Sequence, residues 1–176
     1  MNAGLDNREA RANVRGCTLT EIMVATSVFT LVMASAVPTF IMCQRSWALT
    51  SVQLQAAQRS SAAVERLVYG VGLQYGLRSA VSTTVVLTPG VDWSVAYRDV
   101  VGNSNRFRYD SAARQLHYDG PGAARSVVVG KSITAATVSN SLTGISSGLW
   151  IRVTAGTTEG RFSASNTMTT FVAYRN

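Results

Sequence analysis

The sequence is poor in the residues that form disulfides, hold metal ions and transfer protons. It has two cysteines, Cys17 and Cys43, and a single histidine, His117. On one continuous helix the two cysteines would lie about 39 Å apart, so they cannot form a disulfide within one chain. No cysteine follows Cys43, and the folded part of the chain therefore depends on its core.

Catalytic and metal-binding patterns are also missing from the sequence. His117 alternates with Leu116 in a strand-like run, which indicates a surface position on a strand. The aspartates after residue 90 are dispersed and form no calcium-binding loop. The "GKS" at residues 130–132 lacks the earlier glycine of a phosphate-binding loop. We expect a protein that is not an enzyme and that has no catalytic residues, metal or cofactor.

Lysine is nearly absent, because Lys131 is the only one of the 16 basic residues that is not an arginine. The formal net charge is +7. The arginines that follow the first 44 residues are scattered, and the densest group, Arg106 and Arg108, alternates as on one face of a strand. This scatter indicates a solvated surface, so we do not expect nucleic acid among the partners.

Charge is missing altogether from residues 22–42. This run is long enough to cross a hydrocarbon core of about 30 Å as a helix, and its serines, threonines and Pro38 are tolerated in such spans. A buried helix of a soluble domain is the alternative, and the lack of any charge argues against it. Arg8, Arg11 and Arg15 precede the run, which predicts an N-terminus in the cytoplasm and a C-terminal part outside it.

A motif stands directly before this apolar run. A polar leader with three arginines ends at Gly16, and the chain continues as "CTLTEIMVA", with Glu21 five positions after the glycine. The motif resembles the cleavage signal of the type IV pilin and type II secretion pseudopilin superfamily, roughly G-F-T-L-x-E. The signal residues here are Arg15, Gly16, Thr18, Leu19 and Glu21, whereas Cys17 replaces the usual phenylalanine and Thr20 the usual aliphatic residue.

The resemblance implies processing and assembly in a bacterial inner membrane. A prepilin peptidase would cut between Gly16 and Cys17 and methylate the new N-terminus, and Pro38 stands where many family members have a proline that kinks the helix. The implied partners are this peptidase, other pilin or pseudopilin subunits, an inner-membrane assembly platform and the membrane itself. The assembled chain would belong to a periplasmic or surface filament.

Glu21 has two interpretations that are compatible with each other. Thr18 and Glu21 fit the capping box S/T-x-x-E, in which the two side chains satisfy N–H groups at a helix start, and a carboxylate suits the positive end of the helix dipole. The resemblance implies that the Glu21 carboxylate faces the amine that cleavage creates at Cys17 of a neighbouring subunit. Opposite charges attract strongly where water is scarce.

The remaining pattern predicts an α+β, pilin-like fold, in which a long N-terminal helix packs on an antiparallel sheet. The helix is expected from about residue 18 to 69, with an apolar stripe at Leu49, Val52, Ala56, Ala63, Leu67 and Val71. Strands are expected at 82–88, 91–97, 106–110, 115–119, 125–130, 133–138, 149–154 and 168–174. The predicted segments are a leader (1–16), the membrane half of the helix (17–43), its amphipathic half (44–72) and a β-rich domain (73–176).

The sequence thus predicts a membrane-anchored filament subunit, and its hairpins are similar to those of J-type minor pseudopilins of type II secretion. A minor pilin of a type IV pilus or of a DNA-uptake filament is one alternative. Another is a single-pass anchored domain that never assembles, in which Glu21 serves only as a helix cap.

Overall fold

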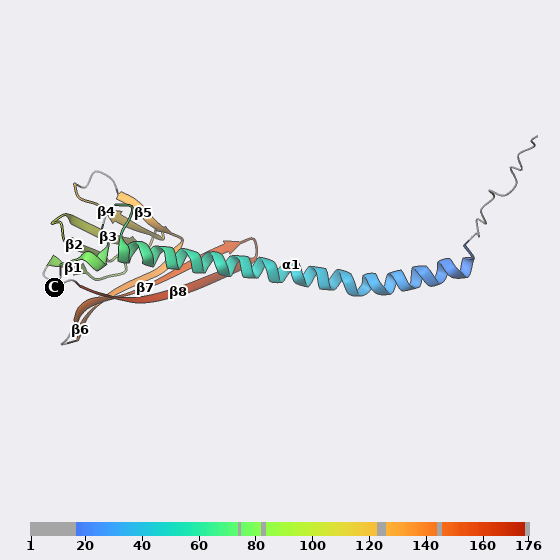
Figure 1. Cartoon of the computed structure of the whole chain (residues 1–176). Coiled ribbons are helices and arrows are strands. Elements are labelled where there is room, and N and C mark those ends of the chain that lie inside the picture. The colour runs from blue at the N-terminus through green and yellow to red at the C-terminus, as the bar shows by residue number, and fades with distance from the viewer. Residues whose placement is uncertain (1–16, 74, 82–83, 123–125, 144–145, 175–176) are drawn as a thin grey trace, which may run out of the picture. The chain divides into compact units, whose positions relative to one another are not determined.

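A computed structural model describes residues 17–73, 75–81, 84–122, 126–143 and 146–174 (Figure 1). The chain divides into two units, Met1–Arg45 and Ser46–Asn176, and α1 contributes to both. In chain order the elements are α1 (Leu19–Tyr69), the short 3-10 helix η1 (Leu77–Ser79), β1 (Val86–Thr88), β2 (Ser94–Arg98), β3 (Ser104–Asp110), β4 (Gln115–Asp119), β5 (Ser126–Lys131), β6 (Ile133–Thr143), β7 (Ser146–Glu159) and β8 (Phe162–Ala173).

The bounds of α1 agree with the sequence prediction. The helix contains no glycine, and it ends where Gly70 adopts φ 104° and donates its N–H to the Arg66 carbonyl at 2.9 Å. Within the second unit its buried residues recur at helical spacing and are Val52, Ala56, Ser60, Ala63, Val64 and Leu67. One member of the predicted stripe, Leu49, is exposed, one turn before the packing begins. Val71 lies beyond the helix, in the bend that follows Gly70, but it still packs against the core.

The strands form two antiparallel sheets, not the single sheet that the sequence predicted. The first has the order β1-β2-β3-β4-β5 and the second the order β6-β7-β8. Ser132 stands between β5 and β6 with φ 59°, and this left-handed conformation turns the chain out of the first sheet. The strands β6, β7 and β8 are also longer than expected. The predicted strand 91–97 starts only at Ser94, and Val91 lies exposed in a bend after Gly90.

One core fills the space between the two sheets and the second part of α1. The first sheet contributes stacked or tilted aromatic side chains, among them Tyr97 and Phe107 with ring centroids 6.0 Å apart. The second sheet contributes aliphatic residues such as Ile151 and Val153. Trp93 Nε1 donates to the Ala136 carbonyl at 2.9 Å, and Tyr109 Oη donates to the Ile133 carbonyl at 2.9 Å. Trp93, which directly precedes β2, and Tyr109 of β3 therefore also satisfy carbonyls of β6.

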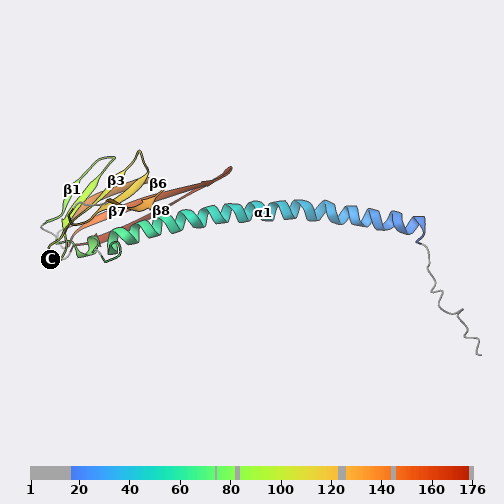
Figure 2. The same cartoon turned by 90° about the horizontal axis from the view of Figure 1, so that it is seen from above.

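Polar contacts from α1 reach both sheets. Arg66 Nη1 donates to the carbonyl of Val129 in β5 at 2.7 Å, and Asn166 Nδ2 of β8 donates to Ser60 Oγ at 2.7 Å. Figure 2 shows both sheets on the same side of this part of the helix. The approach is close, because a Cβ atom on Gly130 would lie 3.3 Å from the Ala63 Cβ. Small residues at this junction let one helix pack on two sheets.

A buried carboxylate organises the turn between β2 and β3. Asp99 is 2% exposed, and its Oδ1 accepts the N–H groups of Val101 at 3.0 Å and Asn103 at 2.9 Å. Its Oδ2 accepts the side-chain amide of Asn105 at 3.3 Å, and Tyr118 Oη donates to Asn105 Oδ1 at 2.7 Å. Burial alone would raise the pKa of Asp99, but these donors outweigh it and hold the pKa below its ordinary value.

We predict that Asp99→Asn lowers the free energy of unfolding by about 1–3 kcal/mol, because an amide group replaces a charged acceptor among buried donors. The lowered pKa means that the stabilisation is present above the unfolded value of about 3.9 and is lost as the pH falls through the folded value. The difference between wild type and variant should therefore shrink in acid. Urea unfolding of the full chain in detergent, followed by tryptophan fluorescence, measures it.

The matched control is Asp119→Asn. Asp119 is half-buried and forms a surface ion pair with Arg108 at 3.5 Å. Loss of this pair should lower the free energy of unfolding by less than about 0.5 kcal/mol. Equal losses in the two variants would contradict the role assigned to the Asp99 turn.

Candidate functional site

The start of α1 brings Thr18 and Glu21 into reciprocal contact. The Thr18 N–H donates to Glu21 Oε2 at 2.8 Å, and Thr18 Oγ1 donates to the same oxygen at 3.0 Å. In return, the Glu21 N–H donates to Thr18 Oγ1 at 3.3 Å. This is the capping box that the sequence predicts, and it satisfies N–H groups that have no partner within the helix. The hydrogen bonds thus confirm that Glu21 forms part of a helix cap.

The position of Glu21 is unusual for a carboxylate. It is exposed, it lies in the first turn of α1, and the next acidic residue along the chain is Glu65. The four N-terminal N–H groups of a helix carry partial positive charge, which favours an anion at this point. The cap therefore fixes the carboxylate at the head of the helix and leaves it accessible from outside.

The other residues of the predicted signal lie around this cap. Cys17 precedes the helix, is exposed and has a free thiol, and Cys43 is also free, in agreement with the expected lack of pairing. Leu19 is the first helical residue and is exposed. Arg15 and Gly16 lie outside the described residues, so the predicted cleavage site is described only on its Cys17 side.

The part of α1 that belongs to the first unit has an apolar and exposed surface. The helix is long and apolar enough to span a membrane. The exposed large apolar residues between Leu19 and Arg45 are Leu19, Ile22, Met23, Val24, Val28, Phe29, Leu31, Val32, Met33, Val37, Phe40, Ile41 and Met42. Such a surface requires lipid or other apolar helices to cover it.

The hydroxyl groups in this apolar part are satisfied by the helix itself. Between residues 22 and 42, each hydroxyl donates to a backbone carbonyl three or four residues earlier, at distances such as 2.6 Å for Thr30 to Thr26 and 2.8 Å for Thr39 to Ser35. The other residues with such bonds are Thr26, Ser27 and Ser35. These side chains need no water, as an apolar environment demands. Pro38 lies inside the helix, which continues to Tyr69.

The single histidine of the chain lies in the first sheet. His117 lies on β4, half-buried beside the fully buried Leu116, which confirms the predicted alternation, and its Nδ1 lies 3.2 Å from Ser126 Oγ. Within the described ranges there is no group of three histidine, cysteine, aspartate or glutamate residues that could hold a metal ion.

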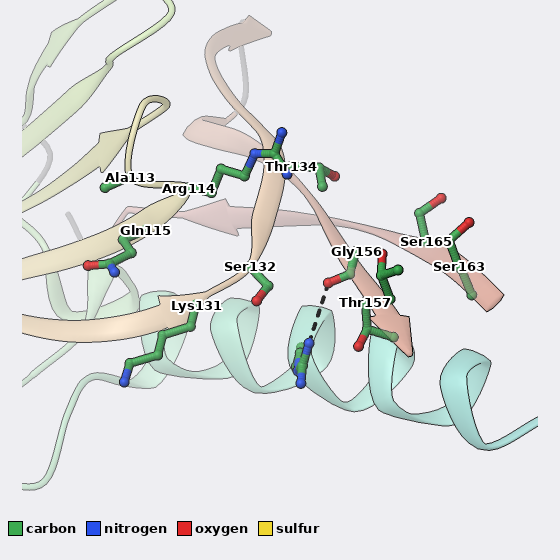
Figure 3. Close-up of a pocket in the computed structure, with 13 residues that line it drawn as sticks. Ala113, Arg114, Gln115, Lys131, Ser132, Thr134, Gly156, Thr157, Ser163 and Ser165 are labelled. Atoms are coloured by element: carbon green, nitrogen blue, oxygen red, sulfur yellow. Dashed lines mark hydrogen bonds between the residues drawn. The ribbon is translucent and has the colours of Figure 1, made fainter. Parts of the chain in front are cut away.

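The structure also contains a polar crevice that the sequence did not predict (Figure 3). It has a volume of about 730 Å³ and lies in the second unit, where α1, the turn after β3, the β5–β6 junction and the β7–β8 hairpin meet. Three cationic residues line it, Arg59, Arg114 and Lys131. They come from separate segments of the chain, so no local motif could have revealed the crevice.

Comparisons of this chain with protein-family models, with curated proteins and with solved structures find no match. Its function is therefore argued from the residues and their geometry.

We predict that Thr18→Ala frays the start of α1, because the variant loses both the acceptor for the Glu21 N–H and a donor to its carboxylate. Amide hydrogen exchange over residues 19–22 of the full chain in detergent should speed up on the order of fivefold, the change expected from the loss of one helix cap. Thr18→Ser keeps the hydroxyl and should exchange like the wild type. Unchanged exchange in the alanine variant would rule out the cap.

Proposed function

We propose that the chain is a non-enzymatic, membrane-anchored subunit of a pilin-like filament, and specifically a minor pseudopilin of type II protein secretion. A prepilin peptidase cuts it between Gly16 and Cys17 and methylates the Cys17 amine. The β-rich domain lies outside the cytoplasm, on the far side of the inner membrane. The observation that carries this proposal is the capped Glu21 carboxylate at the head of an exposed apolar helix.

The position of Glu21 is hard to explain by anchoring alone. A carboxylate that enters a membrane span costs at least a few kcal/mol, and an apolar residue would anchor the chain equally well. A helix start can be capped by a serine, threonine, aspartate or asparagine without any carboxylate in the first turn. A charge at this position is useful if an opposite charge arrives. Cleavage after Gly16 creates such a charge, the amine of Cys17.

Assembly would draw its free energy from the apolar part of α1. Its side chains are exposed between Leu19 and Met42, and they can exchange lipid for the equivalent helices of other subunits. Packing of apolar helices is not specific in register, whereas a pair between the Glu21 carboxylate and a neighbour's Cys17 amine is. The pair would therefore set the stagger between subunits, with the inner-membrane assembly platform as the place where they meet.

A second candidate function is favoured by the capping box itself. Because Thr18 already satisfies the Glu21 carboxylate, the chain could be a single-pass anchored domain that never assembles. The two functions differ in what they require of Glu21. A cap needs an acceptor oxygen, and a subunit pair needs a negative charge.

The processing step is tested by mass spectrometry of the N-terminus of the full chain, isolated from membranes that contain an active prepilin peptidase. We expect a chain that begins at Cys17 and carries one added methyl group, and an intact chain from cells that lack the peptidase. An intact Met1 in the presence of the active enzyme would refute the proposal.

The assembly step is tested by a pair of variants. Glutamine can replace glutamate in a capping box, so Glu21→Gln keeps the cap but removes the charge, whereas Glu21→Ala removes both. We expect both variants to enter sheared filaments at least about tenfold less than wild type, because an amide cannot form the ion pair. Hydrogen exchange at residues 19–22 should be normal in Glu21→Gln. Normal incorporation of Glu21→Gln would rule out the subunit pair, whereas absence of the wild-type chain from sheared filaments would favour the anchored domain that never assembles.

A further inference from the structure

The crevice of about 730 Å³ in the second unit is lined by cations and hydroxyl groups. Besides Arg59, Arg114 and Lys131, its lining includes six hydroxyl side chains, which are Ser132, Thr134, Thr157, Thr158, Ser163 and Ser165. Among the residues that the structure describes, no carboxylate and no aromatic side chain lines it. Figure 3 shows the labelled residues arriving from several strands above α1, with the dashed hydrogen bond between Arg59 and the Gly156 carbonyl at 3.5 Å.

The positive charge extends beyond this crevice. A neighbouring hollow of about 420 Å³ along α1 shares Arg59 and Lys131 with it and adds Arg66, again without a carboxylate in its lining. In the part of the chain that the structure describes, the one ion pair within 4.0 Å joins Arg108 to Asp119, and neither residue lines either hollow. Like charges gathered without a counter-charge repel each other, and an anion between them would remove this repulsion.

Two residues with an unfavourable backbone conformation line the crevice. Among the described residues, only Arg114 (φ 53°) and Ser132 (φ 59°) are non-glycine residues with positive φ, and both line the crevice. Glycine or asparagine would adopt this conformation more easily than arginine. The Arg114 carbonyl accepts the Ile133 N–H at 3.0 Å, and the Ser132 carbonyl accepts the Gly156 N–H at 2.9 Å, so neighbouring segments hold both conformations. Strain that is maintained in this way is typical of functional sites.

We propose that this crevice binds a phosphate or sulfate group, free or carried on a polyanion other than nucleic acid. Such a group has up to two negative charges and three strong acceptor oxygens, so it suits guanidinium, ammonium and hydroxyl donors better than a carboxylate would. Figure 3 shows the Arg114 and Lys131 side chains pointing in opposite directions, so separate groups of a polyanion would reach them more fully than one group. Single-stranded nucleic acid is disfavoured because, among the described residues, the lining offers no aromatic surface on which bases could stack. Every lining residue belongs to the second unit, whereas Glu21 belongs to the first.

Two triple variants with equal loss of charge test the proposal. Arg59→Gln, Arg114→Asn and Lys131→Gln together remove the three crevice cations. Arg98→Gln, Arg106→Gln and Arg152→Gln remove three exposed arginines that do not line it. Calorimetric titration of the full chain in detergent with inorganic phosphate, and with dextran sulfate against uncharged dextran, measures binding. We expect affinity to fall at least about tenfold in the crevice triple and less than about twofold in the control triple.

The single variant Arg114→Asn separates binding from folding. Asparagine tolerates the left-handed conformation, so the Tm should be unchanged or raised while phosphate affinity falls. Binding of inorganic phosphate would show that the group alone suffices, and crevice-dependent binding of dextran sulfate alone would show that a polymer must carry it. Equal losses in both triples, or binding of neither probe, would overturn the proposal.

Discussion

The β-rich part of the structure depends on how closely α1 approaches the two sheets. Along one face of the helix the buried residues are small or medium-sized, and Ala63 lies where a side chain on Gly130 would crowd it. This contact allows the helix to cover β5 and, a turn away, to reach β8 through Ser60 and Asn166. The two sheets can therefore share one core, although the chain leaves the first sheet for good at Ser132.

Arginine suits the junction between helix and sheets because of its donors. Among the described strands, β5 pairs only with β4, so the Val129 carbonyl faces the helix instead of another strand. Strand β6 begins at Ile133, opposite Ala155 of β7, so the next carbonyl of β7, that of Gly156, also faces the helix. Arg66 and Arg59 donate to these two carbonyls. A guanidinium has five N–H donors, and one hydrogen bond to a carbonyl leaves the others available for a ligand. Arg59 thus serves both the sheet edge and the basic crevice, and Arg66 serves the edge and the neighbouring hollow.

The features that could be predicted from the sequence are those that depend on local periodicity and on short motifs. The bounds of α1 followed from the lack of glycine up to Gly70, and the cap followed from Thr18 and Glu21, which lie three positions apart. The division into two sheets could not be predicted, because it depends on the left-handed conformation of Ser132, a residue type that gives no signal for it. Val91 continued an apolar alternation, but the turn after Gly90 decides its position. The crevice was hidden because its residues come from distant segments.

The cap and the proposed subunit pair at Glu21 need not compete. A carboxylate has two oxygens with about four acceptor positions, and Thr18 uses Oε2 through its N–H and its hydroxyl. The cap therefore holds the carboxylate in one orientation at the positive end of the helix and reduces the conformational entropy that a pair would have to remove. An amine that reaches this point meets an acceptor that is already oriented. In this arrangement the local hydrogen bonds that stabilise the helix start would also orient the carboxylate for the proposed contact with the next subunit.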